Sequence, residues 1–183
     1  MKERVVFAWG RFNPPTIGHE KLLKAVQNIA SGDDFFIYPT HTQDKKKNPL
    51  DSKTKSDLMK KMFPSMSGNI IYEPSTNTII KALQGLQGKY KDCVLVAGSD
   101  RVQSYDTMIS KYNGIEYTFR KLEVVSAGER DPDADGAEGM SASKMRAAAV
   151  QSDFKSFRAG MPSTISDTDC KKLMNQIRDI MLK

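Results

Sequence analysis

The stretch RVVFAWGRFNPPTIGH, residues 4–19, organises the rest of the chain. An apolar run from Val5 to Trp9 is followed directly by Gly10 and Arg11, then by two prolines and by a Gly-His pair that opens a helical pattern. Short apolar runs bounded by glycine and proline are typical of buried strands. The stretch therefore predicts a strand, a tight loop and the start of a helix.

The predicted loop has a chemistry of its own. Gly10 allows the backbone to approach a ligand closely, and the following helix start is expected to present free N–H groups and a positive dipole end. Such a helix start attracts phosphate. Thr16 and His19 are three residues apart, so we expect their hydroxyl and imidazole groups to face the same side. Arg11 can bind phosphate oxygens through its forked guanidinium.

Composition limits the class of protein. The chain has 183 residues, of which 39% are hydrophobic and 27% charged, which is typical of one soluble domain. No apolar run approaches the roughly eighteen residues of a membrane span, and the N-terminus lacks a secretory core, so we expect a cytoplasmic protein with no membrane partner. The net charge of +6 favours anionic partners such as nucleotides, phosphorylated metabolites or nucleic acid.

The two cysteines give no sign of a metal site or a disulfide framework. Cys93 and Cys170 are far apart and lie in no CxxC or Cys/His spacing. We interpret them as reduced, buried thiols.

Apolar runs and helical patterns alternate along the chain. This alternation predicts an α/β fold: a Rossmann-like, doubly wound parallel sheet of about five strands with helices on both faces and a C-terminal helical extension. We expect a Rossmann-like core over residues 1–150 and a helical segment over 151–183 packed on it. The predicted strands are 5–9, 34–40, 69–73, 94–98 and 122–126. The predicted helices are 19–30, 52–63, 76–86, 101–111, 141–150 and 166–181, with Asp51 or Ser52 and Ser141 as caps.

Three segments should meet at one edge of this sheet. Ligands of parallel sheets bind beyond the carboxyl ends of the strands, and residues 10–19, 41–48 and 98–101 each follow a predicted strand. Asp100 has two interpretations, as a ligand of a ribose or an acceptor and as the cap of the helix that follows. Lys45 to Lys47 form either a solvated loop or a phosphate contact, with Lys47 or Lys46 the more suitable residue.

A second motif, MSASKMR, covers residues 140–146. It predicts another helix start with two hydroxyls, those of Ser141 and Ser143, and an arginine, Arg146, one turn further on. These groups could hold the β- and γ-phosphates of a nucleotide. The alternative is an ordinary capped amphipathic helix.

GRFNPPTIGH, residues 10–19, resembles the signature of the HIGH-motif nucleotidyltransferases, with the threonine form of (H/T)xGH at 16–19. MSASKMR resembles the second signature of that superfamily, ISSTxxR, and residues 48–50, Asn-Pro-Leu, resemble its NPF/NPL segment. Residues 96–100 resemble its strand that ends in GSD. The whole layout is most similar to the cytidylyltransferase-like and nicotinamide-nucleotide-adenylyltransferase-like members, especially those of large tailed phages.

The resemblance implies a reaction and a set of site residues. A nucleoside triphosphate, ATP or CTP, and a phosphorylated small molecule would give a nucleotide product and pyrophosphate, with Mg²⁺ held mainly by substrate phosphates and water and not by protein ligands. The implied catalytic residues are Arg11, Thr16, His19, Lys47 and Arg146. The implied nucleotide-binding residues are Gly10, Phe12, Asn13, Gly18, Gly98, Asp100, Ser141 and Ser143.

Several alternatives stay open at this point. The GRFxP lead-in favours ATP with nicotinamide mononucleotide (NMN), whereas the threonine at position 16 favours CTP. A non-catalytic nucleotide-binding or structural phage protein could keep the same fold. Nucleic acid is disfavoured as a partner because the aromatic residues are not clustered for base stacking. The acidic loop of residues 127–139 could be a lid or a plain loop, and a homo-oligomer is possible.

Overall fold

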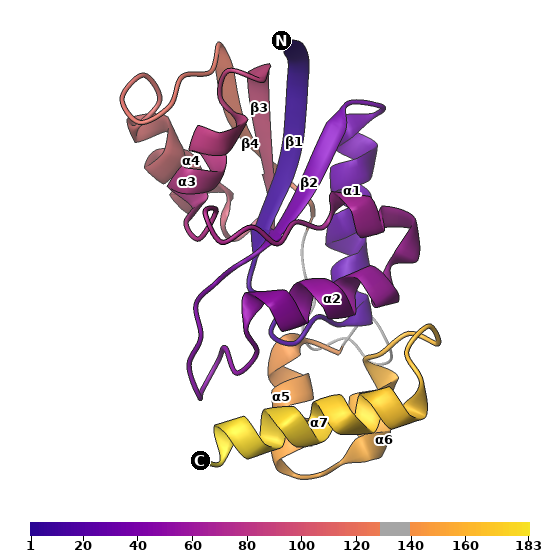
Figure 1. Ribbon diagram of the computed structural model, residues 1–183. Coiled ribbons are helices and arrows are strands. Elements are labelled where there is room, and N and C mark those ends of the chain that lie inside the picture. Colours follow the sequence, from indigo (N-terminus) through magenta and orange to yellow (C-terminus); the bar gives the residue numbers. More distant parts are fainter. Residues whose placement is uncertain (129–139) are drawn as a thin grey trace. The chain divides into compact units, whose positions relative to one another are not determined.

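The computed structural model describes residues 1–128 and 140–183 (Figure 1). The chain forms two compact units, each built from segments that alternate along the sequence. Among the described residues, the first unit comprises Met1–Gly10, Lys21–Thr40 and 71–128, and the second comprises Arg11–Glu20, His41–Ile70 and 140–183. The prediction of one domain over residues 1–183 is not tested by this division and stays a prediction.

The first unit contains a four-stranded parallel sheet with the strand order β2-β1-β3-β4 (Figure 1). Phe7 in the middle of β1 pairs with Phe36 of β2 and Leu95 of β3. The strands are β1 (Lys2–Gly10), β2 (Asp34–Pro39), β3 (Tyr90–Ala97) and β4 (Lys121–Ser126). The helices between them are α1 (Glu20–Ala30), α3 (Ile79–Leu86) and α4 (Val102–Lys111). The α/β class and the parallel sheet are thus confirmed.

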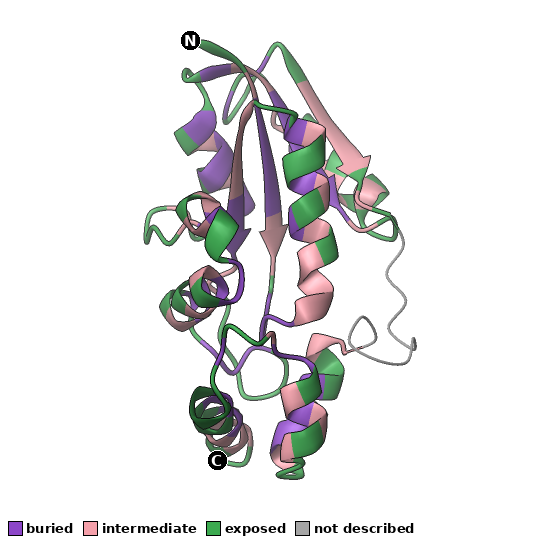
Figure 2. Cartoon of the chain, turned by 90° about the vertical axis from the view of Figure 1, so that its right-hand side faces the viewer, coloured by how far each residue is buried: buried purple, intermediate pink, exposed green. Residues whose placement is uncertain are grey.

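An apolar core fills the first unit. Alternate residues of β1 and β3 face α3 and α4 and are fully buried, as is expected where helices cover a parallel sheet. The two central strands, β1 and β3, therefore form the most buried part of this unit, while the helices keep an exposed face (Figure 2). The core includes Val5, Phe7, Cys93, Leu95, Leu83 and Ile109.

The expected fifth strand, residues 69–73, does not form, so the sheet has four strands. A 3-10 helix, η2 (Pro64–Asn69), occupies the start of this segment. Ile71 makes one backbone bond to β2, from its N–H to the carbonyl of Ile37 at 2.9 Å. Pro74 follows the segment directly, and proline has no N–H with which to extend a ladder.

The second unit is helical. Its helices are α2 (Ser52–Met62), α5 (Ala142–Val150), α6 (Phe154–Ala159) and α7 (Asp167–Met181), with short 3-10 turns η1 (Ile17–His19) and η2. Asp51, Ser141 and Ser166 cap α2, α5 and α7, because each side chain accepts a hydrogen bond from an N–H three residues on. The first two caps were predicted from the sequence and are confirmed.

The apolar stripe of α7 packs within the second unit. There α7 contacts α5 and α6, and its stripe residues Leu173 and Ile177 are buried (Figure 1). The stripe is thus satisfied by helix–helix packing. The expected packing of the C-terminal helical segment on the Rossmann-like core stays a prediction. The acidic loop lies almost wholly outside the described residues, since 129–139 are not among them.

No helix in the described parts of the chain is long and apolar enough to span a membrane.

Candidate functional site

The loop after β1 is anchored to the segment that leads into α2. The Asn13 side chain is fully buried, donates from Nδ2 to the carbonyl of Leu50 at 2.9 Å and accepts from the Leu50 N–H at 2.8 Å. The amide side chain thus imitates one rung of a strand ladder. Asn13 was predicted to bind nucleotide; the structure shows its side chain holding the loop through these two bonds, and the nucleotide contact stays a prediction.

Thr16 and His19 form a capping box at the start of η1. The Thr16 N–H donates to Nδ1 of His19 at 2.9 Å, and the Thr16 hydroxyl oxygen accepts from the Gly18 N–H at 3.1 Å. Because Nδ1 of His19 accepts, a neutral imidazole must carry its proton on Nε2. Nε2 is therefore the ring nitrogen that carries the donor proton in this form of His19.

The ring of Phe12 holds the His19 imidazole from another side. The two ring centroids are 4.9 Å apart with an interplanar angle of 83°, an edge-to-face arrangement. Phe12 itself is buried and has a φ of +46°, in the left-handed region that non-glycine residues rarely adopt. The orientation of His19 is thus fixed by Thr16 and by Phe12, both in the preceding loop.

The expectation of free N–H groups at this helix start is wrong for the first turn. The Ile17 N–H donates to the carbonyl of Gly160 at 2.9 Å, the Gly18 N–H to the Thr16 hydroxyl, and the His19 N–H to the Thr16 carbonyl at 3.0 Å. Thr16 is also only 1% exposed. A phosphate at this site would therefore be bound by side chains, with His19 Nε2 in the first place, and not by these amides.

Arg146 joins the second motif to the first. It lies on α5, one turn after Ser143, and its Nη1 donates to the carbonyl of Asn13 at 2.8 Å. Burial lowers the pKa of Arg146, and the positive charge of Arg11 lowers it further. Two guanidinium groups thus lie within electrostatic reach of each other, which favours an anion between or beside them.

The hydroxyls of the second motif have different surroundings. Ser141 uses its hydroxyl oxygen to accept from the Lys144 N–H at 3.1 Å, so it caps α5. Ser143 is exposed on the first turn of the helix. The structure therefore leaves Ser143 the more accessible of the two predicted phosphate contacts.

The lysine loop is organised by Asp44. Its carboxylate accepts from the Asn48 side chain at 2.8 Å and from the backbone N–H groups of Lys46, Lys47 and Asn48. These bonds, that from the Asn48 side chain first, hold the pKa of Asp44 well below its usual range. The loop closes into a turn that leaves the Lys47 side chain exposed, as a phosphate contact requires.

Sequence reasoning missed Lys55. This residue of α2 is fully buried, and its Nζ donates to the carbonyl of Arg11 at 2.7 Å. Burial lowers its pKa to about 8, against the opposing attraction of Asp51. The sequence did hold a signal, because the buried residues of α2 follow helical spacing. They are the polar or charged Ser52, Lys55 and Ser56 and the apolar Met59 and Met62.

Gly98 and Asp100 follow β3 and belong to the first unit. The Arg101 N–H donates to the carbonyl of Gly98 at 2.9 Å, which closes a turn and leaves Asp100 exposed. Helix α4 begins at Val102 without any side-chain cap. The capping interpretation of Asp100 is therefore wrong, and its predicted contact with a ribose or an acceptor stays a prediction. Gly10, at the end of β1, accepts from the Thr40 N–H at 2.8 Å in the same unit.

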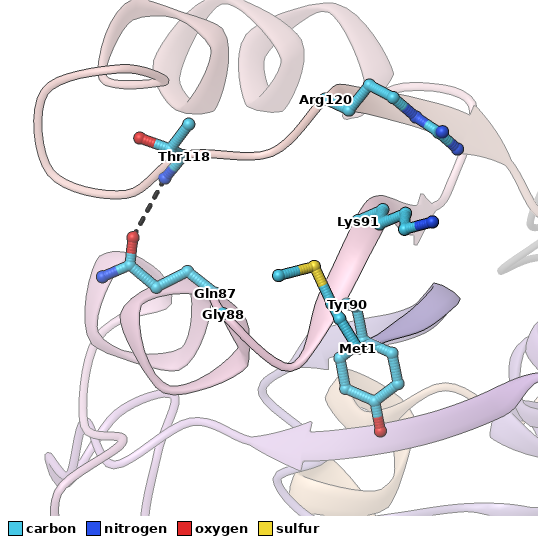
Figure 3. A pocket seen from close by; sticks show the side chains of 7 residues that line it. All are labelled: Met1, Gln87, Gly88, Tyr90, Lys91, Thr118 and Arg120. Atoms are coloured by element: carbon cyan, nitrogen blue, oxygen red, sulfur yellow. Dashed lines mark hydrogen bonds between the residues drawn. The ribbon is translucent and has the colours of Figure 1, made fainter.

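The first unit also has a shallow cavity of about 550 Å³, at the amino-terminal edge of the sheet (Figure 3). Its cations are already neutralised within that unit, because Lys91 pairs with Glu3 at 2.7 Å and Arg120 with Asp92 at 2.9 Å. Ligands of parallel sheets bind at the opposite, carboxyl edge. We therefore give this cavity no part in the site, although it is large. It is lined by Met1, Gln87, Gly88, Tyr90, Lys91, Thr118 and Arg120.

The chain belongs to the cytidylyltransferase-like family, whose model matches residues 7–148. No curated protein matches the chain. Among solved structures, the fold is similar to that of the Plasmodium falciparum nicotinic acid mononucleotide adenylyltransferase complexed with NaAD. The identity is 14% and the TM-score 0.63, over 99% of this chain and 100% of that one.

Two other solved structures have a similar fold. A bifunctional NMN adenylyltransferase/ADP ribose pyrophosphatase from Francisella tularensis is 15% identical, with a TM-score of 0.57 over 100% of this chain and 53% of that one. TmcAL from Thermotoga maritima is 12% identical, with a TM-score of 0.56 over 98% of this chain and 57% of that one. The chain thus spans little more than half the length of these two proteins.

Proposed function

We propose that the protein is a nucleotidyltransferase that transfers a nucleoside monophosphate from a triphosphate to a phosphorylated small molecule and releases pyrophosphate. Membership of the cytidylyltransferase-like family supports this class. One contact carries the proposal further: the hydrogen bond from Arg146 to the Asn13 carbonyl joins, within one unit, the two motifs to which we assign phosphate binding.

The reaction needs alignment and charge stabilisation more than covalent help. A phosphate oxygen of the acceptor attacks the α-phosphorus, the bond from that phosphorus to the bridging oxygen breaks, and pyrophosphate leaves. Holding the two anions in line can contribute about 7–11 kcal/mol. In this proposal His19 donates from Nε2 to the transferred phosphate, and Arg11, Arg146 and Lys47 stabilise the charge on the triphosphate and the leaving pyrophosphate.

We favour ATP as the donor and NMN as the acceptor. The GRFxP lead-in supports ATP, and two of the similar structures are named adenylyltransferases of nicotinic acid mononucleotide and NMN. The family name and the threonine at position 16 favour CTP as the alternative donor. Gly98 and Asp100 keep their predicted contact with the ribose or the acceptor.

Mg²⁺ would enter as a complex with the triphosphate. The side chains that we propose to bind phosphate carry guanidinium, imidazole, ammonium and hydroxyl groups, whereas Mg²⁺ prefers several anionic oxygen ligands. Those oxygens are abundant on the substrate. The residues of the second unit would thus bind the Mg²⁺–triphosphate complex through its remaining phosphate oxygens.

The test is release of pyrophosphate by the purified protein with ATP or CTP, Mg²⁺ and a panel of phosphorylated acceptors that includes NMN. We expect Arg146→Ala to lower kcat/KM by about 100-fold or more, the usual loss when one preorganised donor to a developing charge is removed. Lys144→Ala, an exposed position on the same helix, is the matched control and should keep the wild-type rate.

The outcomes separate the alternatives. Nucleotide binding without pyrophosphate release from any pair would favour a non-catalytic nucleotide-binding protein. If no turnover occurs with the folded protein, and His19→Ala does not change nucleotide binding, the enzyme proposal is lost.

A further inference from the structure

Lys55 is buried at a position where an apolar side chain would fit the helix pattern. Its side chain is fully buried on the face of α2 that also contains Met59 and Met62. Removing an ammonium group from water costs several kcal/mol unless good hydrogen bonds compensate. Its Nζ donates to the carbonyl of Arg11 at 2.7 Å, a short charge-assisted bond. This contact gives a reason for a charge in the core.

The contact lies beside a strained turn. Phe12, directly after Arg11, has a φ of +46°, and such a conformation in a non-glycine residue persists only where the surroundings fix it. Lys55 holds the backbone before Phe12, and the paired bonds between Asn13 and Leu50 hold it after Phe12. The segment from Leu50 to Lys55 therefore fixes the turn on both sides.

The Arg11 side chain depends on this turn for its direction. It is exposed, and it has no hydrogen bond or ion pair to any residue that the structure describes. Only its backbone is held, by Lys55. Arg146 is held on the same loop through the Asn13 carbonyl. Contacts to the carbonyls of Arg11 and Asn13 thus tie both arginines to this loop, Arg11 by its backbone and Arg146 by its guanidinium.

We propose that Lys55 is a positioning residue for phosphate binding, which holds the Arg11 carbonyl and thereby directs the Arg11 guanidinium toward the anion that Arg146 also binds. This inference rests on the proposed function. Lys55 does not touch the substrate in this account. Its effect passes through Arg11, and this dependence makes the inference testable.

A double-mutant cycle tests it with Lys55→Met, Arg11→Ala and the two combined. Lys55→Met keeps the length of the side chain and removes the donor. We expect it to lower kcat/KM at least tenfold in the wild-type background and less than twofold in the Arg11→Ala background. Lys55→Arg, which keeps a donor, should recover part of the loss. Lys61→Met, exposed on the same helix, should keep the wild-type rate.

Two results would overturn the inference. One is an equal loss in both backgrounds, which would mean that Lys55 acts without Arg11, and the other is no loss at all. If Lys55→Met does not fold, Lys55→Gln replaces it in the cycle. If neither variant folds while Lys61→Met does, Lys55 serves folding and the inference fails.

The same cycle can be run without turnover. Calorimetry with pyrophosphate measures the affinity of each variant, and we expect Lys55→Met to weaken it at least fivefold only when Arg11 is present. Hydrogen exchange of residues 10–19 should be faster in Lys55→Met than in wild type. If transferase activity is absent but this coupling is present, the enzyme proposal is rejected and the positioning role of Lys55 is kept. If the losses of affinity in the two single variants are additive, only the positioning role of Lys55 is rejected.

Discussion

The two units are stabilised by different kinds of interior. The core of the first unit is apolar, with Val5, Phe7, Cys93 and Leu95 on one face of the sheet. Apart from tyrosines, the buried polar or charged side chains among the described residues all belong to the second unit: Asn13, Thr16, Asn48, Ser52, Lys55 and Ser56. Two of these, Asn48 and Ser56, each have a buried side-chain oxygen without a hydrogen-bond partner in the described part of the chain.

The difference shows which unit loses stability to buried polar atoms. A buried polar atom without a hydrogen-bond partner lowers the free energy of unfolding by about 1–3 kcal/mol, and the apolar core of the first unit avoids that loss. The second unit keeps its polar interior next to the loop of residues 11–19, which carries the candidate site. We interpret the polar interior of the second unit as the part that orders this loop. The apolar core of the first unit is the part that stabilises the folded chain.

The largest expected effect tests the apolar side of this comparison. Leu95→Ala in the middle of β3 removes a fully buried side chain and should lower the free energy of unfolding by about 3–5 kcal/mol. Urea denaturation measures the loss. Protein that remains folded should bind pyrophosphate as wild type does, because Leu95 belongs to the other unit. A loss below about 1 kcal/mol would show that this core does not stabilise the chain as described.

The second prediction tests the polar side through pH. Burial lowers the pKa of Lys55 to about 8 from its ordinary value of 10.5. Between these pH values the unfolded chain binds a proton at Lys55 that the native chain lacks, so the free energy of unfolding rises with pH. Across this pH range the free energy of unfolding of wild type should therefore rise, relative to that of Lys55→Met, by at most about 3 kcal/mol.

Neighbouring ionisable groups enter this pH measurement as well. Asp51 opposes the shift of Lys55, and Lys55 adds to the effect of burial in lowering the pKa of His41. Burial raises the pKa values of Tyr38, Tyr90, Tyr117 and Cys93, but all four belong to the first unit and cancel in the difference. Urea denaturation of the two proteins from about pH 7 to about pH 10 measures it. A difference that does not change with pH would show that Lys55 titrates normally.

The smallest effects come from a matched pair of glycines. A Cβ at Gly160 would overlap the sulfur of Met145, so Gly160→Ala should lower the free energy of unfolding by about 1–3 kcal/mol. Gly85 is exposed within α3, and a Cβ there meets no atom within 4 Å. Gly85→Ala should therefore raise the free energy of unfolding by about 0.5–1 kcal/mol. Thermal unfolding of both variants measures the pair, and equal shifts would contradict the described packing.

Local signals predicted much of the fold. Asp51 and Ser141 are caps because a side chain reaches its own helix, and such contacts can be predicted from a few neighbouring residues. The apolar run of residues 94–98 predicted β3 in the same way, although the strand begins earlier, at Tyr90. The run of residues 69–73 was misleading because its apolar pattern did not reveal that its start belongs to η2 and that Pro74 follows it directly.

Contacts between distant segments were harder to predict. The acceptor of the Ile17 N–H is the carbonyl of Gly160, which is far away in sequence. The sequence therefore predicted a free N–H group at a helix start where that group already has a hydrogen-bond partner. The Lys55 ammonium and the Arg11 carbonyl are likewise brought together only by folding. The two motifs predicted which residue types form the candidate site, but not which of their donors are already in use.

The alternation of segments between the two units has a consequence for fragments of this protein. Since the chain passes back and forth, no single cut produces one whole unit beside a remainder. Proteolysis or a premature stop after residue 70 would deprive both halves at once, the first of β3 and β4 and the second of α5 to α7. Neither unit could therefore be moved into another protein as one continuous segment. A biosensor or split-reporter design would have to insert new sequence at loop tips and keep the order of the segments.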